Sequence, residues 1–356
     1  MTLVDNSAVV NSLTGLFKRA SFLFCLLAIC GVLGLSGCGS KPDIIKISGT
    51  ALGTTYHVTI VADQPAPDDL AERIKAILEV VDQSMSTYKD DSEISLFNRL
   101  PINTAQQISA EFSQVLAISR MIWQQSGGAF DPTVGPLVDL WGFGPVRTHN
   151  LVPTDEQIET AISAIGYQHV QLTDDRLSKT QPLRLDLSAV AKGYAVDQIA
   201  DMLEMLALPD YLVEVGGEMR LSGSNPKGQL WRVAVEQPSL IPQVQQVIEV
   251  ADTAMATSGD YRNYFESDGV RYSHSIDPRT GRPVNHGLAS VTVLAATCAE
   301  ADAWATALTI LGEEQGMLLA EQLSLAVYML VKVDDSFKVI SSTAFAPYLN
   351  QSDSPD

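Results

Sequence analysis

The sequence predicts an α+β fold, in which helices pack on mostly antiparallel strands. Two observations favour this class over a regular winding of parallel strands and crossover helices. Strand-like patterns dominate from residue 170 onward and are interrupted by three helical segments. In addition, segments 218–221 and 232–235 match an antiparallel pair. The 46% hydrophobic composition suffices for one large domain or for two closely joined lobes.

Each expected element has a local signal. Residues 47–61 alternate in polarity around Gly53, which predicts a strand entered through a turn. Thr154 and Gln157 have the spacing of a capping box, which predicts the start of a helix. One-sided apolar spacing predicts helices over residues 68–82, 110–125, 154–165, 191–206, 299–311 and 315–322. Apolar or alternating runs predict strands over residues 170–173, 183–187, 212–215, 219–222, 231–236, 247–250 and 288–294.

The N-terminal segment has the pattern of an export signal. Lys18 and Arg19 precede an apolar run over residues 22–35, which is shorter than the ~20 residues of a membrane span. The run ends in Leu-Ser-Gly-Cys, the form of a bacterial lipobox, in which Cys38 would carry the lipids. A short anchor helix with a chance cysteine is the alternative. The lipobox predicts a protein anchored by lipid to a bacterial membrane, inner or outer, on the periplasmic side.

The segment boundaries follow from this pattern. We expect a signal peptide over residues 1–37, a lipidated tether over 38–46, a folded domain over 47–350 and a disordered tail over 351–356. Because Cys25 and Cys30 lie in the signal and Cys38 becomes the lipid anchor, the folded domain retains Cys298 alone. We therefore expect no intramolecular disulfide.

The charge balance excludes one class of partner. The formal net charge is −19, and such a surface repels phosphate backbones, so we expect no nucleic-acid partner. A phosphorylated ligand would need a cation to bind here. The chain also has no nucleotide-binding glycine pattern of the common kinds and no nucleophile elbow.

Four segments concentrate the residues that would form a binding site. Residues 126–144 are rich in glycine and proline, which is typical of backbone that must approach a bound group closely. Segments 186–193, 273–283 and 301–308 combine acids, hydroxyls and basic residues. Their presence in one domain predicts a common site.

Asp302 and Thr306 are one helical turn apart, so their oxygens would share a face. A carboxylate and a hydroxyl in this arrangement suit a hard cation such as Mg²⁺, which prefers oxygen ligands. Taken alone, such a pair is usually two solvated or capping neighbours on a helix.

Asp186 is expected where a strand hands over to a helix, a junction that suits an anion because of the positive helix end. Lys192, one turn inside that helix, would then pair with a phosphate. In the alternative, Ser188 caps the helix and Lys192 is an ordinary surface lysine.

His274 lies among turn-forming polar residues with Asp277 three positions away, which suits a general base or a ligand contact. A hydrogen-bonded structural histidine is the alternative. Residues 257–260 form another expected loop with hydroxyls, or else a helix N-cap.

The order of these motifs resembles the ApbE-type FAD:protein FMN transferases. The resemblance covers residues 47–345 and rests on eight motifs: G-T-x-x-G-T from Gly49, S-T-Y followed by D-S-E-I-S-x-F-N, G-G-A-F-D-P-T-V-G-P-L, D-L-S-A-x-A-K-G, the pair Gly216-Gly217, A-T-S-G-D-Y, S-H-x-I-D-P-R-T-G-x-P and A-D-A-W-A-T-A-L.

The resemblance implies an exported, Mg²⁺-dependent enzyme that uses FAD as substrate. Such an enzyme joins FMN through a phosphoester to a Thr or Ser hydroxyl of an acceptor protein and releases AMP. Known acceptors include subunits of Na⁺-translocating NADH:quinone reductases and Rnf-type complexes. The implied fold is one α+β domain of two closely joined subdomains with a flavin cleft between them. Two alternatives are an FAD pyrophosphatase that makes FMN and AMP, and a non-catalytic flavin-binding lipoprotein.

The family pattern also assigns roles to matching positions. The metal ligands would be the Ala189 carbonyl oxygen and the side chains of Asp302 and Thr306, while His274 or Asp277 would receive the proton of the acceptor hydroxyl. FAD contacts would come from Leu52, Tyr88, Ala129, Phe130, Asp131, Asp186, Lys192, Ser258, His274 and Ile276. The chain departs from the family pattern at Leu52, where Met is common, and at Glu218, where Asp is common. Leu for Met nearly conserves volume, so we expect flavin packing to survive.

Overall fold

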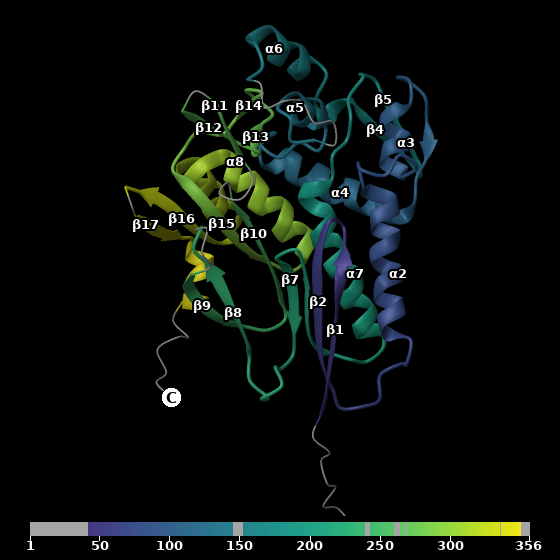
Figure 1. Ribbon diagram of the computed structural model, residues 1–356, viewed down its shortest axis with the longest axis vertical. Helices are drawn as coiled ribbons and strands as arrows, with labels where there is room; N and C mark the ends of the chain where they lie inside the picture. The colour runs from purple at the N-terminus through teal and green to yellow at the C-terminus, as the bar shows by residue number, and fades with distance from the viewer. Residues whose placement is uncertain are drawn as a thin grey trace, which may run out of the picture. The chain divides into compact units, whose positions relative to one another are not determined.

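An eight-stranded sheet forms the centre of the fold (Figure 1). Its order is β1-β2-β6-β7-β10-β15-β16-β17, and every neighbouring pair is antiparallel. The computed structural model describes residues 42–144, 152–238, 243–259, 264–267, 269–334 and 336–349. The strands are β1 (Asp43–Ala51), β2 (Thr54–Ala62), β6 (Asp210–Val215), β7 (Glu218–Ser222), β10 (Thr253–Gly259), β15 (Leu288–Ala295), β16 (Ala326–Val333) and β17 (Ser336–Ser341).

Four long helices form the main apolar core together with this sheet. They are α2 (Leu70–Met85), α4 (Ala110–Gln125), α7 (Ser188–Met205) and α8 (Cys298–Leu323). Helix α8 contains a kink at Gly312, whose φ of 77° is not helical. Among the described residues, no helix has the length and apolarity that a membrane crossing requires.

Two smaller cores complete the fold. The hairpin of β8 (Trp231–Glu236) and β9 (Val244–Val250) packs with the C-terminal turns η2 (Thr343–Phe345) and α9 (Ala346–Leu349) in one of them. The other core joins α5 (Gly135–Leu140) and α6 (Asp155–Ser163) to β11 (Tyr264–Ser267), β12 (Val270–Ser273) and β13 (Ile276–Asp277). The remaining elements are α3 (Glu93–Arg99), β3 (Gln106–Gln107), η1 (Tyr167–His169), β4 (Val170–Thr173), β5 (Arg176–Lys179) and β14 (Arg282–Pro283).

The α+β class is confirmed, and several elements match their predictions. Helix α4 has the predicted bounds, and both hydrogen bonds of the capping box between Thr154 and Gln157 are present. The separate helices expected over 299–311 and 315–322 correspond to the two parts of α8, before and after the kink at Gly312. Residues 47–61 form parts of two strands, because the turn at Leu52 and Gly53 joins β1 and β2 into a hairpin.

Two strand predictions are wrong. Segment 218–221 does not pair with 232–235, because β7 pairs with β6 and β10 while β8 pairs with β9. Residues 183–187 alternate in burial but form no strand, apart from one bridge between Arg184 and Val134. The Asn98 side chain takes the place of a neighbouring strand at Leu185. It accepts from the Leu185 N–H at 2.7 Å and donates to the Leu185 carbonyl at 2.9 Å.

The compact unit starts before the expected boundary. Strand β1 begins at Asp43, so the last four residues of the expected tether belong to the central sheet. The expected signal peptide, Cys38 and the expected tail over 351–356 lie outside the described residues.

Candidate functional site

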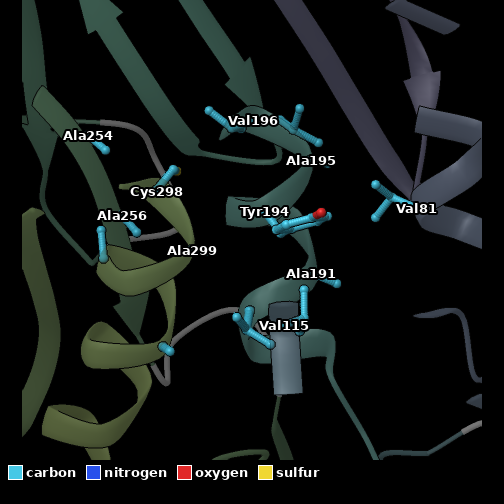
Figure 2. Packing of buried hydrophobic residues seen from close by; sticks show 14 of the residues in the cluster. Val81, Val115, Ala191, Tyr194, Ala195, Val196, Ala254, Ala256, Cys298 and Ala299 are labelled. Atoms are coloured by element: carbon cyan, nitrogen blue, oxygen red, sulfur yellow. The ribbon is translucent and has the colours of Figure 1, made fainter. Parts of the chain in front are cut away.

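The close contact between α7 and α8 positions the acidic and basic groups of the site. A Cβ atom on Gly193 would lie 2.3 Å from the carbonyl oxygen of Cys298, so glycine at this position allows the two backbones to touch. Figure 2 shows the first turn of α8, with Cys298 and Ala299, between α7 and β10. The glycine of the 186–193 motif therefore serves helix packing.

Asp197 fixes the start of α8. Its carboxylate accepts from the backbone N–H groups of Cys298 at 2.8 Å and Ala299 at 2.9 Å, and Arg220 pairs with it at 3.3 Å. These are donors that a helix start leaves without partners. Burial raises the pKa of Asp197 to about 6, although these N–H groups and Arg220 oppose the shift.

Lys192 lies between two buried carboxylates, and we call Lys192, Glu218 and Asp302 the charge cluster. The Lys192 Nζ is 2.7 Å from Glu218 Oε1 and 3.6 Å from Asp302 Oδ2. Each carboxylate side chain is 7% exposed, and Asp302 Oδ2 also accepts from the Gly193 N–H at 3.1 Å. Lys192 is therefore not the ordinary surface lysine of the alternative interpretation.

The charges in the cluster shift one another's protonation. Burial raises the pKa of Asp302 and of Glu218, and the nearby ammonium group partly opposes this. Burial disfavours the charged Lys192, but Asp302 and Glu218 outweigh it and raise the pKa of Lys192. With all three groups ionised, the cluster carries two negative charges and one positive charge, which suits a cation.

Sequence reasoning missed Glu218 as a site residue. It follows Gly216 and Gly217, whose φ values of 67° and 106° form the turn between β6 and β7. A Cβ on Gly216 would lie 2.9 Å from Thr54 Cγ2 and 3.3 Å from Lys192 Cδ, so the turn must contain glycine. The signal in the sequence was an acid placed directly after this glycine pair.

Thr306 lies on α8 with Asp302, and Ala189 lies on α7 with Lys192. Thr306 is half-buried one turn beyond Asp302, and its hydroxyl makes no hydrogen bond with the described part of the chain. By contrast, the Thr309 hydroxyl donates to the Ala305 carbonyl at 2.8 Å. Ala189 is in the first turn of α7.

A cation at this place would need mixed oxygen donors. Within the described ranges, no group of three or more His, Cys, Asp or Glu side chains converges to hold a metal. The available donors are instead a carboxylate, a hydroxyl and a backbone carbonyl, which fit a hard cation that keeps several waters. The residues present therefore fit Mg²⁺ better than Zn²⁺.

The glycine-rich segment uses its acid to hold its own backbone. Asp131 accepts from the Thr133 N–H at 2.8 Å, the Thr133 hydroxyl at 2.6 Å and the Tyr167 N–H at 3.3 Å. Burial raises the pKa of Asp131 against these hydrogen bonds. Ala129 and Phe130 are buried beside it, so the side chains of these three predicted flavin contacts point into the protein.

Asp186 joins the glycine-rich segment to α7. Its N–H donates to the Pro132 carbonyl at 2.7 Å, and its carboxylate accepts from the Ser188 N–H at 2.9 Å. Ser188 is the first residue of α7, so Asp186, and not Ser188, supplies the side-chain acceptor at this helix start.

The segment over 273–283 packs against the end of the glycine-rich segment. Trp141 Nε1 donates to the Gly281 carbonyl at 2.8 Å, and the His274 ring contacts the Phe143 ring with centroids 6.3 Å apart. Ile276 is buried in the same small core. These contacts join two motifs that are more than 120 residues apart in the sequence.

The two predicted proton acceptors differ in their surroundings. Both carboxylate oxygens of Asp277 accept from the Arg279 guanidinium, at 2.9 and 2.8 Å, and Oδ1 also accepts from the Arg279 N–H at 2.9 Å. Asp277 thus stabilises the turn before Gly281. His274 lies between β12 and β13 and is half-buried.

The other predicted flavin contacts are on separate elements. Leu52 has a φ of 52° in the β1–β2 turn and packs partly on the main core. Tyr88 follows α2 and its side chain is strongly exposed, at 75%. Ser258 is half-buried in β10, so the loop or helix cap expected over 257–260 is wrong for residues 257–259, and Asp260 lies outside the described residues. No hydrogen bond or ion pair among the described residues joins these three to the charge cluster.

Comparison with known proteins gives a consistent set of relatives. The sequence profile of the ApbE family matches residues 52–329. The chain is 45% identical over 333 residues to a protein of Vibrio cholerae named FAD:protein FMN transferase, covering 92% of this chain and 99% of the relative. It is 43% identical to a protein of that name from Haemophilus influenzae, covering 90% of this chain and 96% of the relative.

Solved structures agree. The flavin transferase ApbE from Vibrio cholerae has a TM-score of 0.81 and 44% identity, covering 86% of this chain and 100% of that chain. The apo flavinyl transferase ApbE from Pseudomonas stutzeri has a TM-score of 0.81 and 39% identity, covering 87% of this chain and 98% of that chain.

Proposed function

The chain belongs to the ApbE family and is an enzyme of the FAD:protein FMN transferase class, and we propose that it acts with Mg²⁺ on a Thr or Ser hydroxyl of an acceptor protein. In this reaction the hydroxyl oxygen forms a bond to the phosphorus on the riboflavin side of FAD. The pyrophosphate P–O bond breaks, AMP leaves, and the hydroxyl proton passes to a base.

The observation that carries this proposal is the charge cluster. Asp302 would share the cation with the Thr306 hydroxyl, one helical turn further along α8, and with the Ala189 carbonyl in the first turn of α7. When bound, Mg²⁺ neutralises the charge that a pyrophosphate brings into the site. Lys192 would hold a phosphoryl oxygen from the other side, because its position between two carboxylates keeps the ammonium charged.

We infer that His274 accepts the proton of the acceptor hydroxyl. Asp277 would have to give up its paired contacts with Arg279 before it could take a proton, and these contacts fix the turn that follows His274. The turn then positions the imidazole, and Phe143 packs against its ring. An imidazole can accept a proton at neutral pH, which suits a general base.

The flavin contacts remain those of the family pattern. Tyr88 has the exposed ring expected of a side chain that stacks on an isoalloxazine. Leu52 is held in the left-handed region, where a non-glycine residue is strained, and such strain often marks a ligand contact. Asp131 and Asp186 would act by fixing loop and helix backbone near the flavin.

The cellular setting also belongs to this proposal. Cys38 would carry the lipid anchor and hold the enzyme on the periplasmic side of a bacterial membrane. Its acceptors would be exported or membrane redox subunits, such as those of Na⁺-translocating NADH:quinone reductases or Rnf-type complexes.

Intact-mass spectrometry of an acceptor domain tests this function. The full chain in detergent is incubated with FAD, Mg²⁺ and an acceptor with a D-G-x-[ST]-G-A-T site, and AMP is measured in parallel. We expect the acceptor to gain the mass of one FMN and the gain to disappear in EDTA. AMP release without any acceptor would instead indicate a pyrophosphatase, and intact FAD in all mixtures would indicate a flavin-binding protein.

Asp302→Asn tests the metal assignment. The variant keeps the size of the side chain but removes the charged ligand, so we expect FMN transfer to fall by about 1,000-fold, in line with the several kcal/mol that a metal Lewis acid contributes. Asp201→Asn is the matched control, because Asp201 is half-exposed on α7 and pairs with Arg220. Full turnover of Asp302→Asn at saturating Mg²⁺ would contradict the assignment.

A further inference from the structure

Glu218 has one carboxylate oxygen in use and one without a partner. Oε1 pairs with Lys192 at 2.7 Å, whereas Oε2 is buried and accepts no hydrogen bond from any described residue. A buried carboxylate oxygen without a donor is costly, so such an atom calls for a ligand, a water or an ion. The side chain as a whole is 7% exposed.

The turn between β6 and β7 lies close to the oxygen without a partner. A Cβ on Gly216 would lie 3.3 Å from Oε2, so a side chain at this position would crowd the carboxylate. The same turn carries Gly217, which also has no side chain. Oε2 therefore lies beside a turn made of backbone alone, in the same cluster as the candidate metal ligand Asp302.

Glu218 also decides the sign of the cluster. With Asp302 and Lys192 alone, one carboxylate would be neutralised by one ammonium. Glu218 adds a second negative charge and draws Lys192 to 2.7 Å, while Asp302 stays at 3.6 Å from the ammonium. Asp302 is thereby left as the weaker partner of Lys192 and has greater freedom to bind a cation.

We propose that Glu218 is a positioning residue that sets the cation affinity of the site, by holding Lys192 away from Asp302 and by accepting a hydrogen bond through Oε2 from a water of the bound cation. This inference rests on the proposed function for the existence of the cation site. It adds a residue that the metal ligands and flavin contacts named above do not include.

Binding of Mn²⁺ to the full chain, followed by the EPR signal of the free ion, tests the inference without any turnover. In Glu218→Gln the cluster loses one negative charge and Lys192 has Asp302 as its remaining charged partner. We expect the Mn²⁺ Kd to rise by at least about tenfold, as charge removal in a buried site predicts. Glu218→Asp keeps the charge, and we expect its Kd to lie between those of the wild type and Glu218→Gln.

Glu214→Gln is the matched control. Glu214 is on the same hairpin and is also a paired acid, since it contacts the His57 ring at 2.8 Å and the Gly217 N–H at 2.6 Å. Because it has no contact with Lys192, we expect its loss to leave the Mn²⁺ Kd unchanged.

The outcomes separate this inference from the proposed function. If the wild-type chain binds Mn²⁺ and Glu218→Gln binds it with the same Kd, the role of Glu218 is overturned and the proposed cation site is not. An equal rise in Kd for Glu214→Gln would also overturn it, because the effect would then be one of general surface charge. If the wild-type chain binds no Mn²⁺ with or without FAD, the cation site of the proposed function fails, and this inference fails with it. If Glu218→Gln does not fold, Glu218→Asp decides: a wild-type Kd there overturns the positioning role, and an increased Kd supports it.

Discussion

Two lysines in this protein, the buried Lys179 and the partly buried Lys192, have opposite surroundings. Lys179, at the end of β5, is 2% exposed and donates to the carbonyls of Phe97 at 3.3 Å, Asn98 at 2.9 Å and Leu183 at 3.0 Å. Its ammonium also lies 5.2 Å from the centroid of the Phe97 ring. No carboxylate of a described residue pairs with it, and burial lowers its pKa.

Lys192 is paired with charges in place of carbonyls. Two carboxylates hold it, and they raise its pKa in spite of burial. A lysine that donates to backbone carbonyls of its own fold holds those segments together and has a structural role, because its partners are neutral and already bonded. A lysine between carboxylates belongs to a site that can take up a cation and an anion together. The partners of a buried lysine thus distinguish a structural residue from a functional one.

Replacing each lysine by methionine should separate the two roles, and the largest effect is expected at the site. We expect Lys192→Met to reduce FMN transfer by about 100-fold to 1,000-fold, the range seen when one group that stabilises transition-state charge is removed. The assay is the rate of FMN gain by the acceptor at saturating FAD and Mg²⁺. Lys227→Met, at an exposed position, is the control.

The same variant should bind cations more tightly, because Asp302 and Glu218 then lack their ammonium partner. We expect the Mn²⁺ Kd of Lys192→Met to fall, the opposite of the change in Glu218→Gln. Equal shifts of both variants in one direction would show that the charge count of the cluster does not control the site.

Lys179→Met should leave the chemistry unchanged and weaken the fold. Three buried carbonyls lose their donor, so we expect the free energy of unfolding to drop by about 2–4 kcal/mol, because unpaired buried acceptors cost about 1–3 kcal/mol each before relaxation. Urea unfolding measures the drop. A Lys179→Met enzyme that is as stable as the wild type but inactive would reverse the comparison.

The pH dependence of stability gives a smaller contrast. The pKa of Lys179 in the folded protein is below its ordinary value of 10.5. At low pH both states hold the proton, and the folded state bears the full cost of burying the charge. As the pH rises toward 10.5 the folded protein releases the proton first, so wild-type stability should rise relative to Lys179→Met. A flat difference from pH 7 to 10.5 would contradict this. Lys192 has the opposite sign, because its raised pKa keeps its contribution in place throughout this range.

Local sequence signals predicted the parts of the fold that depend on local interactions. Helix α4 and the capping box at Thr154 involve residues three or four apart, and both were predicted correctly. The strand prediction for residues 183–187 was wrong because Asn98, far away in the sequence, makes the backbone hydrogen bonds of Leu185. The predicted pairing of 218–221 with 232–235 was wrong because an alternating pattern specifies which face of a strand is buried and not which strand lies beside it.

The candidate site was predicted from motifs, and the structure adds Glu218 to it. Asp302, Lys192 and Asp186 were predicted because each stands in a distinctive local pattern. Glu218 was noticed only as a departure from the family pattern, since its contact with Lys192 joins the β6–β7 turn to α7 and no spacing in the sequence shows it. Asp131 and Asp277 each bind a residue two positions further along the chain, and these hydrogen bonds also depend on loop geometry that the sequence does not show.

The central claim is that the charge cluster is where a divalent cation binds. Crystals of the full chain soaked with MnCl₂ and FAD, with diffraction collected at a wavelength where manganese scatters anomalously, test it most directly. We predict an anomalous peak in contact with the Asp302 carboxylate and the Thr306 hydroxyl, with Lys192 and Glu218 beside it. A strong peak elsewhere in the protein, with none at Asp302, would contradict the account.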